Sequence, residues 1–224
     1  MSAPVAVIVG AGPGVGAAMA RMLGRNGWAI ALIARDEGRL TALGESLQAE
    51  DITVGWTALD VTDTDELTAA VTRFGGFGGQ IDLLHHNAVA FRTARATELT
   101  AAQLLTDLTV GAASLLTSVQ AALPFLRPGS VVLATGSGSG RSPMTSAASL
   151  GVQKAALRNL VSALDQDLRE RGIRAASLTV NGTIAAGTPF DPELIAGALA
   201  DLAALAGSAG AGWRTEVPFD GATT

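Results

Sequence analysis

The 224-residue sequence has no cysteine, no tyrosine and only one lysine, Lys154. The absence of cysteine excludes disulfides and thiolate metal sites. The absence of tyrosine excludes a phenol as a catalytic proton donor. Because the other 14 of the 15 basic residues are arginines, we expect the single lysine where a guanidinium cannot replace it. A lysine ammonium is compact and its pKa responds to burial, whereas arginine is a planar fork.

Charge is also scarce, and long apolar runs are absent. Charged residues make up 16% of the chain and the net charge is −5, which gives no electrostatic reason to bind nucleic acid or an anionic membrane. The apolar opening Ala3–Ala20 has no basic residue before Arg21 and contains Pro13, unlike a signal peptide. No run reaches the ~18 uninterrupted apolar residues of a membrane helix. We therefore expect a cytoplasmic protein, and we predict no metal site.

Hydrophobic residues make up 48% of the chain, enough for one domain spanning residues 1–224. Apolar runs of strand length alternate with segments of helix length. Runs without polar alternation predict strands covered on both faces, and the order predicts a Rossmann-like, doubly wound parallel sheet of the α/β class. The predicted strands are Val5–Val9, Trp28–Ala34, Ile52–Leu59, Ile81–His85, Ser130–Ala134, Ile173–Val180 and Trp213–Val217. The predicted helices are Gly14–Asn26, Glu37–Ala49, Asp63–Phe74, Thr100–Leu126, Ser146–Arg171 and Asp191–Leu205.

Three local signals support the helix boundaries. Thr100 and Gln103 have the spacing of a capping box. Asp63 stands where an acceptor is needed at the start of another helix. Gly172 follows a run that ends with Arg171, as a helix C-terminal stop does.

A glycine-rich loop joins the first predicted strand to the first predicted helix. Glycines there allow close approach of the backbone to a pyrophosphate, which the helix N-terminus then faces. A glycine turn that only packs the helix on the strand is the alternative. The spacing Gly-x-x-x-Gly-x-Gly in a strand–helix setting predicts a dinucleotide site that contains Gly10, Gly12, Pro13, Gly14, Val15 and Gly16.

The end of the second predicted strand bears on the choice of dinucleotide. An acidic residue at this place binds a ribose 2′-hydroxyl, but the sequence has Ala34 and Arg35. Arginine suits a 2′-phosphate, so NADP(H) is predicted over NAD(H). An ordinary solvated role for Arg35 is the alternative, and the adjacent Asp36 weakens the electrostatic preference.

Taken in order, these motifs resemble the short-chain dehydrogenase/reductase family over nearly the whole chain. The glycine spacing is that of the family. Leu59-Asp60-Val61 is similar to its adenine-contacting Asp-Val, and Leu83–Val89 resembles its Asn-Asn-Ala-Gly strand end. Gly129–Ser137 followed by Leu150-x-x-x-Lys154 resembles its serine strand and active-site helix. Val180–Ile184 resembles its cofactor-facing loop.

The resemblance implies roles for individual residues. Lys154 would hold the nicotinamide ribose hydroxyls, and Ser137, thirteen residues before Leu150, would orient the substrate. Leu150 replaces the family's tyrosine, and Gly111, thirteen residues before Pro124, replaces its asparagine. The resemblance therefore implies a divergent member with an altered proton donor. Further cofactor contacts are implied for Asp60, Val61, Asn87, Ala88, Gly182 and Ile184.

The two histidines are alternative proton donors. His85 and His86 end the fourth predicted strand, where alternation sends them to opposite faces. At most one of them can therefore face a cofactor cleft, and a structural role is favoured for both. A water, the substrate or Lys154 itself are other proton sources. A solvated position on a helix surface is the alternative for Lys154.

Two functions stay open at this stage. The first is an NADP(H)-dependent oxidoreductase that acts on a small carbonyl or alcohol substrate. The second is a non-catalytic dinucleotide-binding protein, either a sensor or a partner subunit. A short substrate segment is expected at about residues 185–212. The apolar helices at 100–126 and 146–171 resemble those that family members pair across a two-fold axis, which implies a homodimer or homotetramer.

Overall fold

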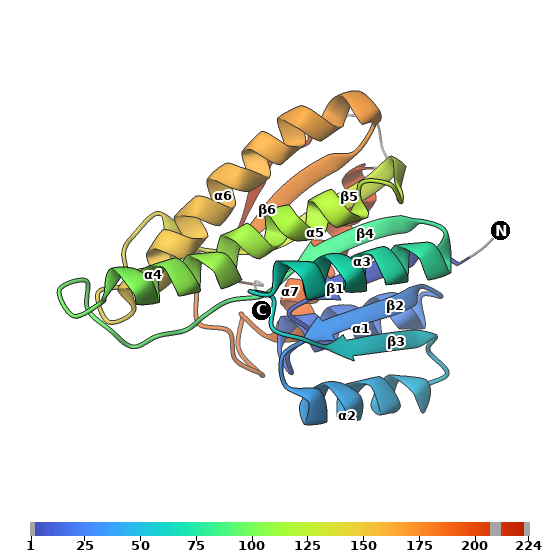
Figure 1. Cartoon of the computed structure of the whole chain (residues 1–224), viewed down its shortest axis with the longest axis horizontal. Coiled ribbons are helices and arrows are strands. Elements are labelled where there is room, and N and C mark those ends of the chain that lie inside the picture. Colours follow the sequence, from blue (N-terminus) through green and yellow to red (C-terminus); the bar gives the residue numbers. More distant parts are fainter. Residues whose placement is uncertain (1–2, 207–211, 222–224) are drawn as a thin grey trace.

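The computed structural model describes residues 3–206 and 212–221, which form a seven-stranded parallel sheet with helices on both faces (Figure 1). The strand order is β3-β2-β1-β4-β5-β6-β7, and the predicted doubly wound α/β fold is confirmed. The strands are β1 Val5–Val9, β2 Ala29–Ala34, β3 Val54–Ala58, β4 Ile81–His86, β5 Leu126–Ser137, β6 Arg174–Val180 and β7 Glu216–Phe219.

Two helical layers cover the sheet. Helices α1, α2 and α7 pack on one face, and α3, α4, α5 and α6 lie on the other. A π-helical turn, Thr109–Ala113, joins α4 to α5, and a 3-10 turn, Arg169–Arg171, follows α6. The helices are α1 Val15–Arg25, α2 Glu37–Gln48, α3 Thr64–Gly78, α4 Ala101–Leu108, α5 Ser114–Ala122, α6 Ala148–Leu168 and α7 Pro192–Ala206.

The central strands are apolar because both of their faces are covered. All five residues of β1 are buried, with Val7 and Val9 in one core and Ala6 and Ile8 in the other. Each buried valine or isoleucine side chain contributes about 1.5–3 kcal/mol relative to an exposed one. The sheet is therefore held by two cores, one on each face.

The strand order reverses between β1 and β4, since β2 lies on one side of β1 and β4 on the other. In an open parallel sheet, ligands bind outside the carboxyl ends of the strands at this reversal. The glycine loop leaves β1 there, and Asn87 follows β4 at the same edge. The fold thus places the predicted dinucleotide residues at the expected edge.

The local boundary signals are confirmed. Thr100 accepts from the Gln103 backbone N–H while the Gln103 side chain accepts from the Thr100 backbone, which completes the capping box. Asp63 caps α3 through its carboxylate. Gly172 has a φ of 72° and ends the helical stretch that includes α6.

The predicted helix Thr100–Leu126 is wrong in two respects. It is interrupted by the π-helical turn around Gly111, and it ends at Ala122, because Pro124 has no backbone N–H with which to continue the helical hydrogen bonds. Leu126 instead begins β5 opposite Ile81, and the register then shifts before Val131 pairs with Leu83.

The predicted last strand, Trp213–Val217, is also wrong in position. The strand β7 spans Glu216–Phe219, and its register is set by pairing with Ser177–Val180 of β6. A strand of four residues carries little pattern of its own, so its register depends on the neighbouring strand.

One stretch of the described residues, Ala101–Ala122, has the length and mean hydropathy, 1.2, of a membrane-spanning helix. The stretch is not an uninterrupted apolar run, because Asp107 and several threonines and serines break it. The stretch packs on α3 and α6, and Asp107 forms an ion pair with Arg92. The stretch is thus partly covered by neighbouring helices of the same fold.

Candidate cofactor and substrate site

The glycine loop is fixed by its contact with the segment after β4. Gly10 has a φ of 92°, and a Cβ there would lie 2.4 Å from the Ala88 backbone nitrogen. The Asn87 side chain donates to the Gly10 carbonyl at 2.9 Å, and the Asn87 backbone N–H donates to Val9 at 2.7 Å. Only glycine allows this approach. Asn87 and Ala88, both predicted as cofactor residues, therefore shape the glycine loop.

Bare backbone faces open space at the start of α1. A Cβ at Gly12 or Gly14 would meet no atom within 4 Å. No side chain caps α1 at Gly14, and its first turn has no acidic residue. A helix N-terminus of this kind attracts an anion such as a pyrophosphate. By contrast, Val15 and Gly16 are buried in the packing of α1 on the sheet.

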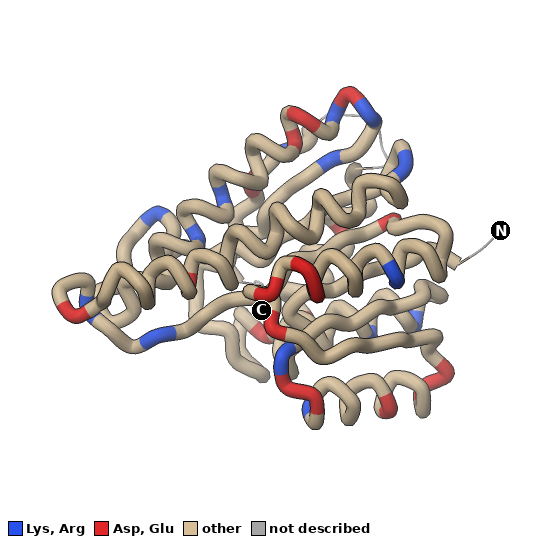
Figure 2. Tube along the Cα trace, viewed as in Figure 1, with Lys and Arg blue, Asp and Glu red and all other residues tan. Residues whose placement is uncertain are grey.

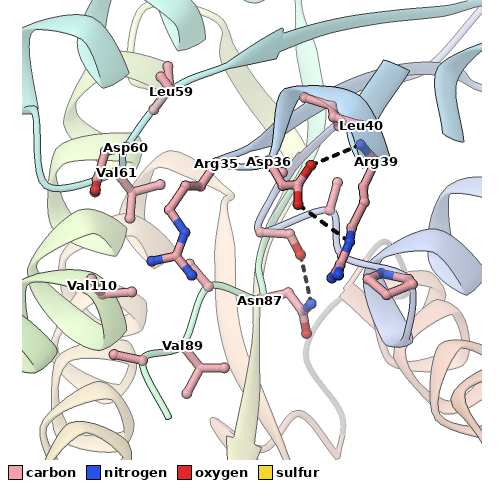
Figure 3. Close-up of a pocket in the computed structure, with 17 residues that line it drawn as sticks. Arg35, Asp36, Arg39, Leu40, Leu59, Asp60, Val61, Asn87, Val89 and Val110 are labelled. Atoms are coloured by element: carbon pink, nitrogen blue, oxygen red, sulfur yellow. Dashed lines mark hydrogen bonds and ion pairs between the residues drawn. The ribbon is translucent and has the colours of Figure 1, made fainter. Parts of the chain in front are cut away.

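A cavity of about 300 Å³ lies along this edge, between the glycine loop, the end of β2 and the end of β3 (Figure 3). It contains most of the residues predicted to bind the adenine half of a dinucleotide. Its lining includes Gly10, Gly12, Pro13, Arg35, Asp60, Val61, Asn87 and Ala88.

Two arginines line this cavity. Arg35 extends into it from the end of β2, and Arg39 lies on the first turn of α2 (Figure 3). Asp36 accepts from the Arg39 backbone N–H at 3.0 Å and lies 3.4 Å from its guanidinium. Arg39 was not predicted as a cofactor residue. Its position four residues after Arg35 is the sequence signal that could have indicated it. Asp36, whose charge weakens the predicted preference for NADP(H), is thus already paired with Arg39.

Asp60 is held ionised at the end of β3. Hydrogen bonds from the Thr62 backbone and then from its hydroxyl keep the pKa of Asp60 below its ordinary value, more than its slight burial raises it. The carboxylate is exposed, and the neighbouring Val61 is buried under the cavity. This pair offers an acceptor and an apolar surface to a planar base.

Lys154 is buried under the carboxyl edge of β5. Its side chain on α6 is 6% exposed, and Nζ donates to the Thr135 carbonyl at 2.7 Å. Burial lowers the pKa of Lys154 from its ordinary value of 10.5 to about 8. The alternative of a solvated surface lysine is therefore wrong. Leu150, one turn earlier on α6, is also buried.

The two histidines point to opposite faces of β4 and are both fully buried. His85 Nε2 lies 2.9 Å from the Thr135 hydroxyl, and His86 Nε2 lies 2.8 Å from the Ser114 hydroxyl. Burial, followed by the charge of Lys154, lowers the pKa of each to about 3. Both are neutral near pH 7, which agrees with the structural role predicted for them.

Ser137 ends β5 at the rim of a second cavity of about 580 Å³. Its hydroxyl oxygen accepts from both the backbone N–H and the hydroxyl of Ser139, at 3.2 and 3.0 Å. These bonds fix the oxygen at the start of a short 3-10 turn. The cavity is lined by Ser137, Gly138, Ser139, Arg141, Ser142, Pro143, Met144, Val180, Asn181, Gly182 and Thr183.

Gln153 fills the space beside Gly111. A Cβ at Gly111 would lie 2.3 Å from Gln153 Oε1, so only glycine fits in the π-helical turn. Gln153 is fully buried, and both ends of its amide bond the same residue: the Ala90 N–H donates to Oε1 at 3.1 Å and Nε2 donates to the Ala90 carbonyl at 2.9 Å. Gln153 thus clamps a wall of the first cavity, which Ala90 lines.

The loop after β6 folds back on itself. Gly182 lies against the Phe190 ring, since a Cβ there would come within 2.2 Å of it. The Asn181 side chain donates to Asp220 at 2.7 Å, and Ile184 is 41% exposed. Of the predicted substrate segment 185–212, residues 207–211 lie outside the described residues.

The structure gathers the predicted residues at one edge, but not all line a cavity. Gly182 and Ser137 line the second cavity. The predicted residues Gly14, Val15, Gly16, Ile184 and Lys154 line neither. Within residues 3–206 and 212–221, no three metal-ligating side chains lie close enough together to hold a metal ion.

Comparisons with known proteins agree with this geometry. The short chain dehydrogenase family model matches residues 4–190. An uncharacterized oxidoreductase of Staphylococcus epidermidis is 30% identical over 193 residues, which cover 83% of this chain and 82% of that protein.

Solved structures show the same fold. A variant short-chain dehydrogenase/reductase from Serratia marcescens is 26% identical, with a TM-score of 0.87 and coverage of 98% of this chain and 97% of that one. A short chain dehydrogenase from Burkholderia cenocepacia, in complex with NADP, is 23% identical, with a TM-score of 0.87 and coverage of 97% and 96%.

The packing of Gly111 on Gln153 gives a first prediction. Gly111→Asn is expected to lower the free energy of unfolding by about 1–3 kcal/mol, because the new side chain overpacks the buried amide. Urea unfolding is the measurement, and Gly76→Asn on α3 is the control, since a Cβ there meets nothing within 4 Å. Adding Gln153→Ala to Gly111→Asn should recover part of the loss. Equal losses for the two asparagine variants would contradict the clash.

Proposed function

Since the chain belongs to the short-chain dehydrogenase family, we propose that it is an NADP(H)-binding oxidoreductase for a small carbonyl or alcohol substrate. The observation that carries the proposal is the first cavity, which is lined by two arginines and by the glycine loop that leads into the acid-free N-terminus of α1. Such a cavity suits a ligand that carries a pyrophosphate and a further phosphate.

The preference for NADP(H) rests on Arg35 and Arg39. In the proposed complex, Arg35 meets the 2′-phosphate at the end of β2, and Arg39 adds a second cation from α2. Asp36 is paired with Arg39, so its charge is partly neutralised where it would repel the phosphate. The relative from Burkholderia cenocepacia binds NADP, which supports this choice for the present chain.

At the other end, Lys154 holds the nicotinamide ribose hydroxyls and Ser137 orients the substrate oxygen. A bound NADPH supplies the hydride, and the protein supplies position and charge. Leu150 takes the place of the family's tyrosine, and Gly111 that of its asparagine. The fully buried Gln153 occupies the space beside Gly111, which is consistent with the loss of the asparagine at that position.

Lys154 is the proton source that the residues favour. Its pKa of about 8 leaves the ammonium mostly protonated at pH 7 yet able to release a proton. The histidines are neutral at that pH, and their Nε2 atoms are engaged by hydroxyls. General acid catalysis typically contributes ~10²–10⁴ in rate, so an enzyme without the phenol would be slower by up to this factor and could still turn over.

A non-catalytic dinucleotide-binding protein is the second candidate. It is favoured by the replacement of both polar positions, by the buried Leu150 and by Gly111. The two functions share the adenine half of the site and differ in turnover.

Arg35 generates the prediction for cofactor choice. Calorimetry should show NADPH binding more tightly than NADH, and Arg35→Ala should weaken NADPH by at least about tenfold, because a charge-assisted bond to the 2′-phosphate is lost. NADH affinity should change little. Arg21→Ala, which is remote from the cavity, is the control. Equal affinity for the two dinucleotides would contradict the 2′-phosphate assignment, and absence of binding would contradict the proposed function.

Lys154 generates the prediction for turnover. Carbonyl reduction at saturating NADPH should fall as pH rises through about 8, where Lys154 loses its proton, with no step near 6.5 because both histidines have a pKa of about 3. Lys154→Met should weaken NADPH binding and abolish turnover. The measurement is NADPH oxidation against a panel of aldehydes, ketones and diones across pH.

Leu150→Tyr separates the two candidate functions in the same assay. An enzyme adapted to work without a phenol should gain nothing, since Gly111 and Gln153 provide no relay for a tyrosinate. Robust activity only in Leu150→Tyr would show that the natural chain binds the dinucleotide without using it. Unchanged binding and turnover in Lys154→Met would contradict the role of the lysine.

We also propose a homodimer or homotetramer formed through α4, α5 and α6. Leu105 and Leu116 are exposed on one side of the α4–α5 stretch, and Val152 is exposed on α6. No charged residue lies on α5 (Figure 2). Isologous pairing of such a face is the usual way to cover it.

Light scattering at micromolar concentration should give at least twice the 22.5 kDa mass of one chain. Leu105→Glu together with Leu116→Glu should shift the protein toward a monomer, because charge is placed in the apolar face. Glu substitution at Phe77, which is 92% exposed on α3, is the matched control. A wild-type monomer would contradict the assembly.

A further inference from the structure

Arg141 is the one charged residue that lines the Ser137 cavity in the described part of the chain. The rest of the lining is hydroxyl, amide, backbone and apolar groups. The Arg141 side chain is 45% exposed. No aspartate or glutamate lines the cavity to neutralise it there.

The position of Arg141 is fixed by a carboxylate outside the cavity. Arg141 lies 2.7 Å from Glu216 Oε1, and Arg158 lies 2.7 Å from Oε2 of the same side chain. Thr179 donates to Oε1 at 2.9 Å. Burial raises the pKa of Glu216, but the bonds from Arg141, Arg158 and Thr179 outweigh it and keep the pKa below its ordinary value. One ionised carboxylate therefore holds two guanidinium groups.

This cluster leaves one positive charge in excess at the wall of the cavity. Glu216 is mostly buried on the edge strand β7 and engages one nitrogen of Arg141. A guanidinium carries five N–H donors, so the contact with Glu216 leaves others for a ligand. Because Glu216 already orders the side chain, binding an anion there costs little further side-chain entropy.

We infer that the substrate carries a carboxylate, which Arg141 binds while Ser137 orients the reacting carbonyl. Arginine forms bidentate bonds with carboxylates, and a site built for such bonds rejects analogues that lack the charge. The substrate class is then a small oxo acid or hydroxy acid. This inference rests on the proposed function and names its substrate class.

Arg158 provides a matched control. It bonds the other oxygen of Glu216 but does not line the cavity. Arg141→Gln and Arg158→Gln each remove one positive charge and one Glu216 partner, so their effects on stability and long-range potential are similar. Only Arg141→Gln removes a contact to a ligand in the cavity.

The experiment compares three pairs of ligands that differ in charge and in carbonyl–carboxylate spacing: pyruvate and pyruvamide, acetoacetate and acetoacetamide, 4-oxopentanoate and 4-oxopentanamide. Affinities are measured by ligand-observed NMR titration at low salt, with and without NADPH, and reduction rates are measured in parallel. The wild type should bind at least one carboxylate about tenfold more tightly than its amide. Arg158→Gln should keep this preference, and Arg141→Gln should lose it.

Two results would overturn the assignment of Arg141. One is a wild type that binds no carboxylate more tightly than its amide. The other is an equal loss of preference in both variants, which would indicate the general field of the cluster and not a contact. Failure of the proposed function gives a different result, because NADPH would then not bind, or would bind without turnover, whatever the carboxylate preference.

Discussion

The close approach of the β1 and β4 carboxyl ends is the constraint on which the site depends. Gly10 adopts a positive φ and touches the backbone at Ala88, while Asn87 ties the two segments by a side-chain and a backbone hydrogen bond. A side chain at position 10 would force these segments apart. The free start of α1 and the first cavity lie beside this contact, and the Gln153 clamp holds Ala90 two residues further along the same segment.

Much of the fold was predictable because its signals are local. Continuous apolar strands, the capping box at Thr100 and the stop at Gly172 act within a few residues. The break in helix 100–126 and the register of β7 were not predictable, since each depends on packing against a distant segment: Gln153 beside Gly111, and β6 beside Glu216.

The same division holds for the candidate site. The glycine loop and Arg35 follow from residue type and spacing, and the structure places them around one cavity. The contacts of Gln153 and the Arg141–Glu216–Arg158 cluster join residues far apart in sequence, so no sequence spacing predicts them. Gly111 in particular has the opposite significance in the two views. In the sequence it is a lost amide, and in the structure it is the space that a buried amide from the next helix requires.

Because the single lysine is buried, its chemical reactivity depends on local separation of α6 from β5. An amine-directed reagent has one side-chain target in the whole sequence, and in the closed state that target is bonded to the Thr135 carbonyl. Its rate of labelling therefore measures how often α6 separates from β5, as amide exchange measures local unfolding elsewhere. Isotopic methylation would likewise give one side-chain resonance, placed under the carboxyl edge of β5. A ligand that binds at the carboxyl edge of β5 and suppresses this separation would be detected as slower labelling of Lys154 Nζ.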